Sequence, residues 1–72
     1  MQKAQVIAAV ESGNFGKEFI DVLPVHGGTG VLFESFASAC LFSLSHCEPF
    51  QSPAKTAIYP DGVAQNAWFV VV

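Results

Sequence analysis

The sequence contains no arginine and few charges of either sign. Its 72 residues carry three lysines against six acidic side chains, and charged residues make up only 12% of the chain. Proteins that bind phosphate backbones do so with clustered lysine and arginine. The shortage of such residues therefore argues against direct binding to nucleic acid.

Long apolar runs are also missing. No stretch reaches the ~18 uncharged apolar residues of a transmembrane helix. The N-terminus, MQKAQVIAAVESG, lacks both the apolar run and the small-residue cleavage site of a signal peptide. The cysteines Cys40 and Cys47 are too few for a disulfide framework. We therefore expect no membrane partner and a reducing, cytoplasmic compartment.

Motifs that carry chemistry are scarce. The paired cysteine or histidine spacing of a structural zinc site is absent, and no carboxylates cluster in the sequence. Neighbouring side chains rarely face each other, so His46 is poorly placed to activate Cys47. We expect no metal, no cofactor and no enzymatic activity. A small thiol or histidine enzyme built on His26, His46 and Cys47 stays as an alternative.

Apolar residues, by contrast, are abundant, at 51% of the chain. Residues 1–72 are expected to form a single domain, and a domain of this size buries only ~60% of the surface that its unfolded chain exposes. So much apolar material is hard for a small monomer to hide. This favours a homo-oligomer, in the simplest case a dimer, or a permanent protein partner.

The longest periodic segment is residues 31–46, VLFESFASACLFSLSH. At ~100° per residue most of its apolar side chains fall on one arc, which predicts a central helix that covers a sheet. Thr29 is the expected N-cap, and Pro49 ends the helix. Ser43 lies on the apolar arc, whereas Phe42 lies among the serines.

The remaining segments predict an α+β domain with the element order α-β-α-β-β. A helix is favoured for residues 2–12, although Gln5–Glu11 can also be read as a strand. Pro24 marks an edge strand or a strand end, and Tyr59–Gly62 has the composition of a turn. The strands of the mainly antiparallel sheet are expected near residues 17–25, 55–59 and 63–72.

Candidate binding residues come from two regions. Phe42 on the polar helical face, and the face of the last strand that carries Phe69 and Val71, are the expected exposed anchors for a partner. Ser38 and Glu34 share the polar helical face with Phe42. These residues predict a non-catalytic interaction module that binds a partner protein or self-associates. A small acidic chain of this kind suits a regulator or inhibitor carried by a phage or other mobile element.

The glycine-rich run before the central segment supports a different function. Gly27, Gly28, Thr29 and Gly30 lie between a predicted strand and a predicted helix. Backbone N–H groups at a helix N-terminus bind anions. A small-ligand or anion-binding protein is therefore the alternative hypothesis, although neither a phosphate-binding loop nor a dinucleotide motif is present.

Overall fold

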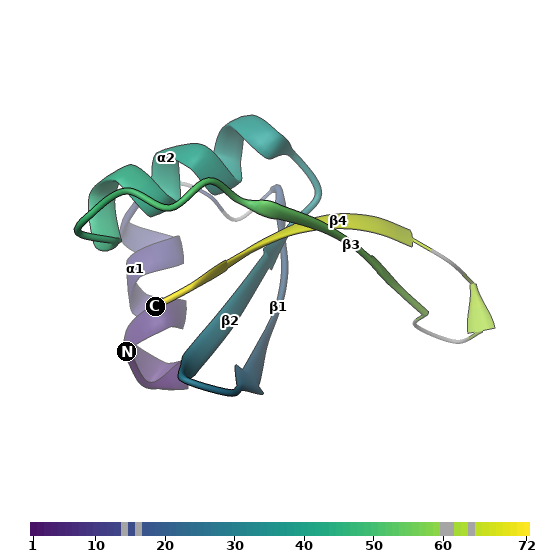
Figure 1. Ribbon diagram of the computed structural model, residues 1–72, viewed down its shortest axis with the longest axis horizontal. Coiled ribbons are helices and arrows are strands. Elements are labelled where there is room, and N and C mark those ends of the chain that lie inside the picture. Colours follow the sequence, from purple (N-terminus) through teal and green to yellow (C-terminus); the bar gives the residue numbers. More distant parts are fainter. Residues whose placement is uncertain (14, 16, 60–61, 64) are drawn as a thin grey trace.

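The computed structural model describes residues 1–13, 15, 17–59, 62–63 and 65–72. The elements follow in the order α1 (Lys3–Ser12), β1 (Phe19–Val25), β2 (Gly28–Phe33), α2 (Phe36–His46), β3 (Ala54–Ile58) and β4 (Gln65–Val71) (Figure 1). The strands form one antiparallel sheet with the order β1-β2-β4-β3. The predicted α+β class and the N-terminal helix are thereby confirmed.

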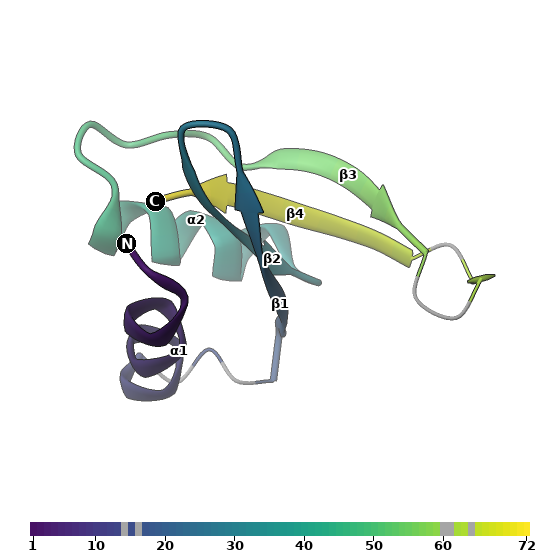
Figure 2. The ribbon, with the colours of Figure 1, turned by 90° about the horizontal axis from the view of Figure 1, so that it is seen from below.

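Both helices pack on one face of this sheet. α1 lies over β1, whereas α2 crosses β2 and β4. Beyond the helices, β3 and β4 extend together, as Figures 1 and 2 show. Buried side chains from the helices, β1, β2 and β4 form the core, namely Val6, Val10, Val22, Val31, Phe33, Ala39, Phe42 and Val70.

The predicted helix over residues 31–46 is wrong in its first part. Gly28–Phe33 is β2, which pairs with both β1 and β4, and α2 begins only at Phe36. A short apolar run has no period that separates a buried strand from a helix. In β2, Val31 and Phe33 point to the helices while Leu32 points to the other face. The element order is therefore α-β-β-α-β-β.

The N-cap of α2 is Ser35 and not Thr29. The Ser35 hydroxyl oxygen accepts a hydrogen bond from the Ser38 backbone N–H at 3.3 Å, the interaction that makes serine a preferred N-cap. Thr29 is a strand residue, and its backbone N–H and carbonyl pair with those of Val72. The end of α2 at His46 agrees with the prediction.

The predicted strand positions agree closely with the sheet. β1 is an edge strand, as Pro24 indicated. Pro24 has no backbone N–H to donate, and an edge strand has no second neighbouring strand that would require one. β4 lies between β2 and β3 and carries apolar side chains toward both faces. Of the predicted turn Tyr59–Gly62, Gly62 has a φ of 79°, whereas residues 60 and 61 lie outside the described residues.

Candidate functional site: the open sheet face

The face of the sheet turned away from both helices is unusually apolar. Residues opposite each other in an antiparallel pair share a face, and alternate residues along a strand change face. The strand register therefore assigns a mainly apolar set of side chains to this face, here called the open sheet face. Its apolar members are Leu23, Val25, Leu32, Ala54, Ile58, Ala67, Phe69 and Val71, and its polar members are Asp21, Thr56 and Gln65. An antiparallel sheet with one covered face normally carries polar residues on the other.

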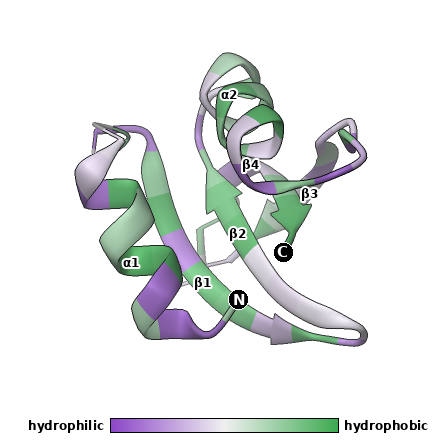
Figure 3. Cartoon of the chain, turned by 90° about the vertical axis from the view of Figure 1, so that its left-hand side faces the viewer, coloured by the Kyte–Doolittle hydropathy of each residue, from purple (hydrophilic) through white to green (hydrophobic). Residues whose placement is uncertain are grey.

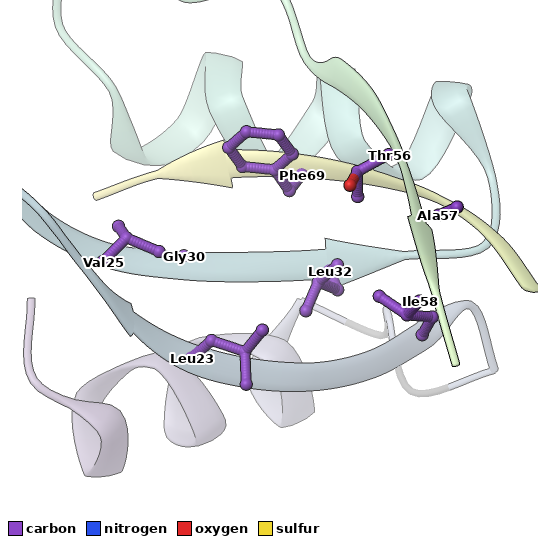
Figure 4. A pocket seen from close by; sticks show the side chains of 8 residues that line it. All are labelled: Leu23, Val25, Gly30, Leu32, Thr56, Ala57, Ile58 and Phe69. Carbon is purple, nitrogen blue, oxygen red and sulfur yellow. The ribbon is translucent and has the colours of Figure 1, made fainter. Parts of the chain in front are cut away.

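A groove runs along the open sheet face (Figure 4). Its volume is about 270 Å³. Leu32 is only 3% exposed and lies at its floor, while Leu23 is 41% exposed at one side. Phe69 from β4 and Ile58 from β3 line the other side. The groove is thus bounded by side chains of every strand of the sheet.

The groove continues toward the start of β1. A second hollow, of about 350 Å³, is lined by Ile20, Asp21, Leu23, Leu32 and Ile58. The last three of these residues also line the first hollow. The two hollows are therefore adjoining parts of one groove.

This end of the groove is acidic. Asp21 is exposed, and its carboxylate accepts a hydrogen bond from the Val22 backbone N–H at 2.7 Å. Glu34 follows β2 directly and accepts a hydrogen bond of 2.8 Å from the Gln65 side chain. Gln65 in turn lies opposite Ile58 in the sheet. Among the described residues, none that lines the groove is basic.

Gly30 helps to keep the groove open. It is buried and lines the groove from β2. A Cβ atom at this position would lie 3.0 Å from a methyl carbon of Val25 and 3.4 Å from the carbonyl oxygen of Leu23. A side chain at this position would therefore narrow the groove.

The structure brings three of the predicted partner-binding residues to the open sheet face or its rim. Phe69 lines the groove, Val71 points to the same face of β4, and Glu34 lies at the acidic end. Ser38 is half-buried in the first turn of α2, and α2 lies on the sheet face opposite the groove. Its backbone N–H donates to the Ser35 hydroxyl oxygen.

The prediction that Phe42 is an exposed anchor is wrong. Its side chain is 0% exposed, whereas Leu41 is 56% exposed. The Phe42 ring packs against Phe33 at 5.3 Å and against Phe15 at 5.7 Å between ring centroids. Apolar residues occur all around α2, so its periodicity does not select the inward face. The aromatic cluster does, because the Phe42 ring meets Phe15 and Phe33 in the core, whereas Phe36 at the start of α2 packs on Trp68 and stays 45% exposed.

The anion-binding hypothesis assumed that the glycine-rich run leads directly into a helix, and this assumption is also wrong. Gly27, with a φ of 88°, lies in the turn between β1 and β2, and Gly28 begins a strand. The backbone N–H of Thr29 donates to Val72, and its hydroxyl group donates to the carbonyl of Met1. Gly30 lies within β2. The run therefore does not open a helix, and α2 begins several residues later.

The structure does not show Cys47, His46 and His26 in contact with one another. The Cys47 thiol lies 3.6 Å from the carbonyl oxygen of Val71. The His46 ring packs on Phe42, with ring centroids 4.5 Å apart, and His26 lies in the turn between β1 and β2. Within the described residues, no group of three or more histidine, cysteine or acidic side chains is arranged to hold a metal ion.

Sequence reasoning missed most of the groove. Leu23, Leu32 and Ile58 were not predicted as binding residues. Leu32 was expected on the apolar arc of a helix, so β2, which lies between the strands of Leu23 and Phe69, was missing from the predicted sheet. The available signal was the apolar composition of consecutive residues in β1, β2 and β4, which leaves no strand face polar. Figure 3 shows this apolar colouring over much of β1, which also has a hydrophilic segment, and over the end of β2 that leads to α2.

No similarity to known proteins points to a function, so the geometry of the open sheet face is the basis for the proposed function. The chain matches no protein-family model, no curated protein and no solved structure. Among the described residues, no helix has the length and apolar character needed to span a membrane.

Proposed function

We propose that this chain is a non-catalytic protein–protein interaction module, a small regulator or inhibitor, and that the open sheet face is its binding surface. The single observation that carries the proposal is the groove, whose lining includes Leu23, Leu32, Ile58 and Phe69. Clustered exposed apolar surface marks interaction sites on small proteins. Burying one leucine or phenylalanine side chain against a partner contributes roughly 1.5–3 kcal/mol to the free energy of binding.

The open shape of the groove favours a protein partner over a small ligand. Pockets for drug-sized ligands usually have volumes of ~300–1,000 Å³ and enclose most of the ligand. The two adjoining hollows, of about 270 and 350 Å³, offer enough volume, but they lie on the sheet face without helices and so do not enclose a ligand. An open apolar groove instead accommodates a row of side chains from a partner segment.

The charges at the groove's end specify the partner further. Asp21 and Glu34 are acidic, and the chain as a whole has a net charge of −3. A second copy of the chain would bring like charges to this end. A partner segment with aliphatic or aromatic side chains next to a lysine or arginine would instead pair its cation with Asp21.

The free cysteines agree with a cytoplasmic site of action, which we propose on this ground. Cys40 and Cys47 are both unbridged and half-buried. Proteins that act outside the cytoplasm commonly use cysteine pairs to stabilise domains of this size. The phage or mobile-element origin of such a regulator remains a proposal from size and charge alone.

Selection from a random peptide library tests this function directly. We expect the wild-type chain to enrich peptides that combine apolar residues with lysine or arginine. Leu23→Asp places a charge in the groove and should abolish that enrichment. Val63→Asp is the matched control, because Val63 is 67% exposed and does not line the groove.

A charge reversal separates the apolar and electrostatic parts of recognition. Asp21→Lys should shift the selected peptides toward aspartate and glutamate while their apolar residues stay. Equal enrichment by the wild type and Leu23→Asp would refute the groove as the binding surface. Peptides without any basic residue would refute the role of Asp21.

A further inference from the structure

The two edges of the sheet differ in the backbone groups that they leave free. In an antiparallel ladder, alternate residues of an edge strand turn their N–H and carbonyl groups outward, away from the neighbouring strand. Thr29 of β2 exchanges both of its backbone hydrogen bonds with Val72, directly after β4. Its partner on β1, Pro24, therefore faces outward. Val22, two residues earlier on β1, faces outward as well.

Neither of these outward positions on β1 offers a donor to an added strand. Pro24 has no backbone N–H, and the Val22 N–H already donates to the Asp21 carboxylate at 2.7 Å. Prolines and charged side chains on edge strands are devices by which proteins avoid pairing with other chains. The β1 edge is therefore closed to a further strand over these residues.

The outer edge of β3 has no such protection. Counting back from Val72 in steps of two, Trp68 bonds to β2, so its partner on β3, Lys55, faces outward. Ala57, two residues further along β3, does the same. Both residues are exposed, and among the described residues β3 has only β4 as a neighbouring strand. Two N–H groups and two carbonyl groups along this edge are thus available to a further strand.

We infer that the partner segment binds as an added β-strand along the outer edge of β3. This inference rests on the proposed function and specifies how the groove recognises its partner. Backbone hydrogen bonds to Lys55 and Ala57 hold the segment, and the groove selects its alternate side chains. The β1 edge, at the other side of the same groove, is closed by Pro24 and Asp21, so the segment has one edge to pair with.

The added strand turns every second side chain toward the groove. Its residue opposite Thr56 lies on the open sheet face, as do the residues opposite Ala54 and Ile58. Ile58 and Asp21 line the same hollow. The position opposite Ile58 is therefore the one from which a lysine or arginine reaches the Asp21 carboxylate. The other groove-facing positions take apolar side chains.

A second copy of this chain does not meet these requirements. If two β3 strands paired with each other, the outward residues Lys55 and Ala57 of one copy would bond to those of the other. Residues 54, 56 and 58 would then face the groove, and these are alanine, threonine and isoleucine. The one cation of β3, Lys55, points to the opposite face. Charge complementarity with Asp21 therefore selects a foreign segment.

Ala57→Pro tests the added strand from the side of this chain. The variant removes one outward N–H, and an edge strand tolerates proline there because the sheet itself does not use that N–H. We expect affinity for the peptides selected from the random library to fall at least about tenfold, because a hydrogen bond is lost and the ring occupies the place of the added strand. Ala57→Val is the matched control, since it changes the same side chain and keeps the N–H. Calorimetry measures the affinity, and thermal unfolding verifies that the variants fold.

N-methylation of the most strongly enriched peptide tests the same contact on the wild-type chain. Methyl groups at alternate backbone amides should abolish binding, and those at the intervening amides should have little effect, because only every second N–H faces β3. Hydrogen exchange of the Lys55 and Ala57 amides should slow when the unmodified peptide binds. A uniform response along the peptide, or unchanged exchange at both amides, would overturn the inference.

Leu23→Asp separates this inference from the proposed function. Loss of binding in Leu23→Asp but not in Ala57→Pro would leave the groove as the binding surface and overturn strand addition. Unchanged binding in both variants would overturn both proposals, as would a wild-type chain that enriches no peptide. A dimer that Ala57→Pro dissociates, measured by sedimentation, would show that a second copy occupies the β3 edge, and would also overturn the inference.

Discussion

Leu23 and Ile58 belong to strands at opposite edges of the sheet, yet both line the same groove. Two strands, β2 and β4, lie between them. In a flat sheet these edges would be about 14 Å apart, at ~4.8 Å per strand. The sheet is therefore curved, so that its edges approach each other on the side without helices. This curvature turns an apolar face into a groove.

Filling this groove from its floor should weaken partner binding. Gly30→Ala adds a methyl group that lies 3.0 Å from a methyl carbon of the Val25 side chain. A single added methyl in a binding pocket changes affinity by about tenfold or more. We expect at least that loss for the selected peptides, measured by calorimetry. Thermal unfolding should change little, because Gly30 has an ordinary strand conformation that alanine also adopts.

An unchanged affinity for Gly30→Ala would show that peptides do not reach the groove floor. Thr56→Ala is a useful companion variant, since Thr56 lines the groove from β3. It removes atoms from the side wall of the groove and adds none to the floor. It should therefore not reduce peptide affinity through a steric clash as Gly30→Ala does.

Truncation of adjacent residues in α2 should have opposite consequences. Phe42→Ala removes a 0% exposed ring that contacts Phe15 and Phe33, whereas Leu41→Ala trims a side chain that is 56% exposed. Buried phenylalanine-to-alanine changes cost about 3–5 kcal/mol. Exposed changes usually stay within about 0.5 kcal/mol. Chemical denaturation measures both.

The two α2 variants together test which face of the helix is turned to the core. Leu41→Ala should retain nearly all of the wild-type unfolding free energy, because the Leu41 side chain is 56% exposed. Similar destabilisation by both variants would contradict the inward orientation of Phe42.

Loss of the Ser43 hydroxyl should loosen the connection between α2 and β3. Ser43 is 0% exposed. Its hydroxyl donates to the Gln51 carbonyl at 2.6 Å and accepts from the Gln51 N–H at 3.2 Å. Ser43→Ala leaves both backbone groups without this partner, which costs about 1–3 kcal/mol. Denaturant unfolding and amide exchange at Gln51 report the loss.

Ser45→Ala is the control for this change. Ser45 is exposed, and its hydroxyl donates to the Leu41 carbonyl within the same helix. Its removal should leave the unfolding free energy nearly unchanged. Equal effects of the two substitutions would mean that the Ser43–Gln51 pair adds nothing to stability.

Local signals in the sequence were enough to predict the strands and helices that have clear boundaries. Pro24 indicated the edge position of β1, and alternation in the last strand correctly separated Trp68 from Phe69. The run Val31–Phe33 was ambiguous, because a strand buried on both faces has no polar positions to reveal its period. The missing strand then shifted the expected helix start from Phe36 to residue 31.

The inward face of α2 could not be predicted from periodicity either. Phe42 is buried because Phe15 and Phe33, which are distant in sequence, meet it in the core. The groove depends in the same way on long-range pairing, since Leu23 and Ile58 approach only after the whole sheet has formed. Strand alternation correctly placed Phe69 and Val71 on one face of β4, whereas Glu34 was expected on the polar face of a helix and lies instead between β2 and α2.

The position of both helices on the side opposite the groove has a consequence for how the chain can diverge. The core is built from side chains that point toward the helices, such as Val31, Phe33 and Phe42. Most of the groove lining points the other way, from Leu23 on β1 to Ile58 on β3. The groove can therefore change its side chains, and with them the segment that it recognises, while the core stays the same.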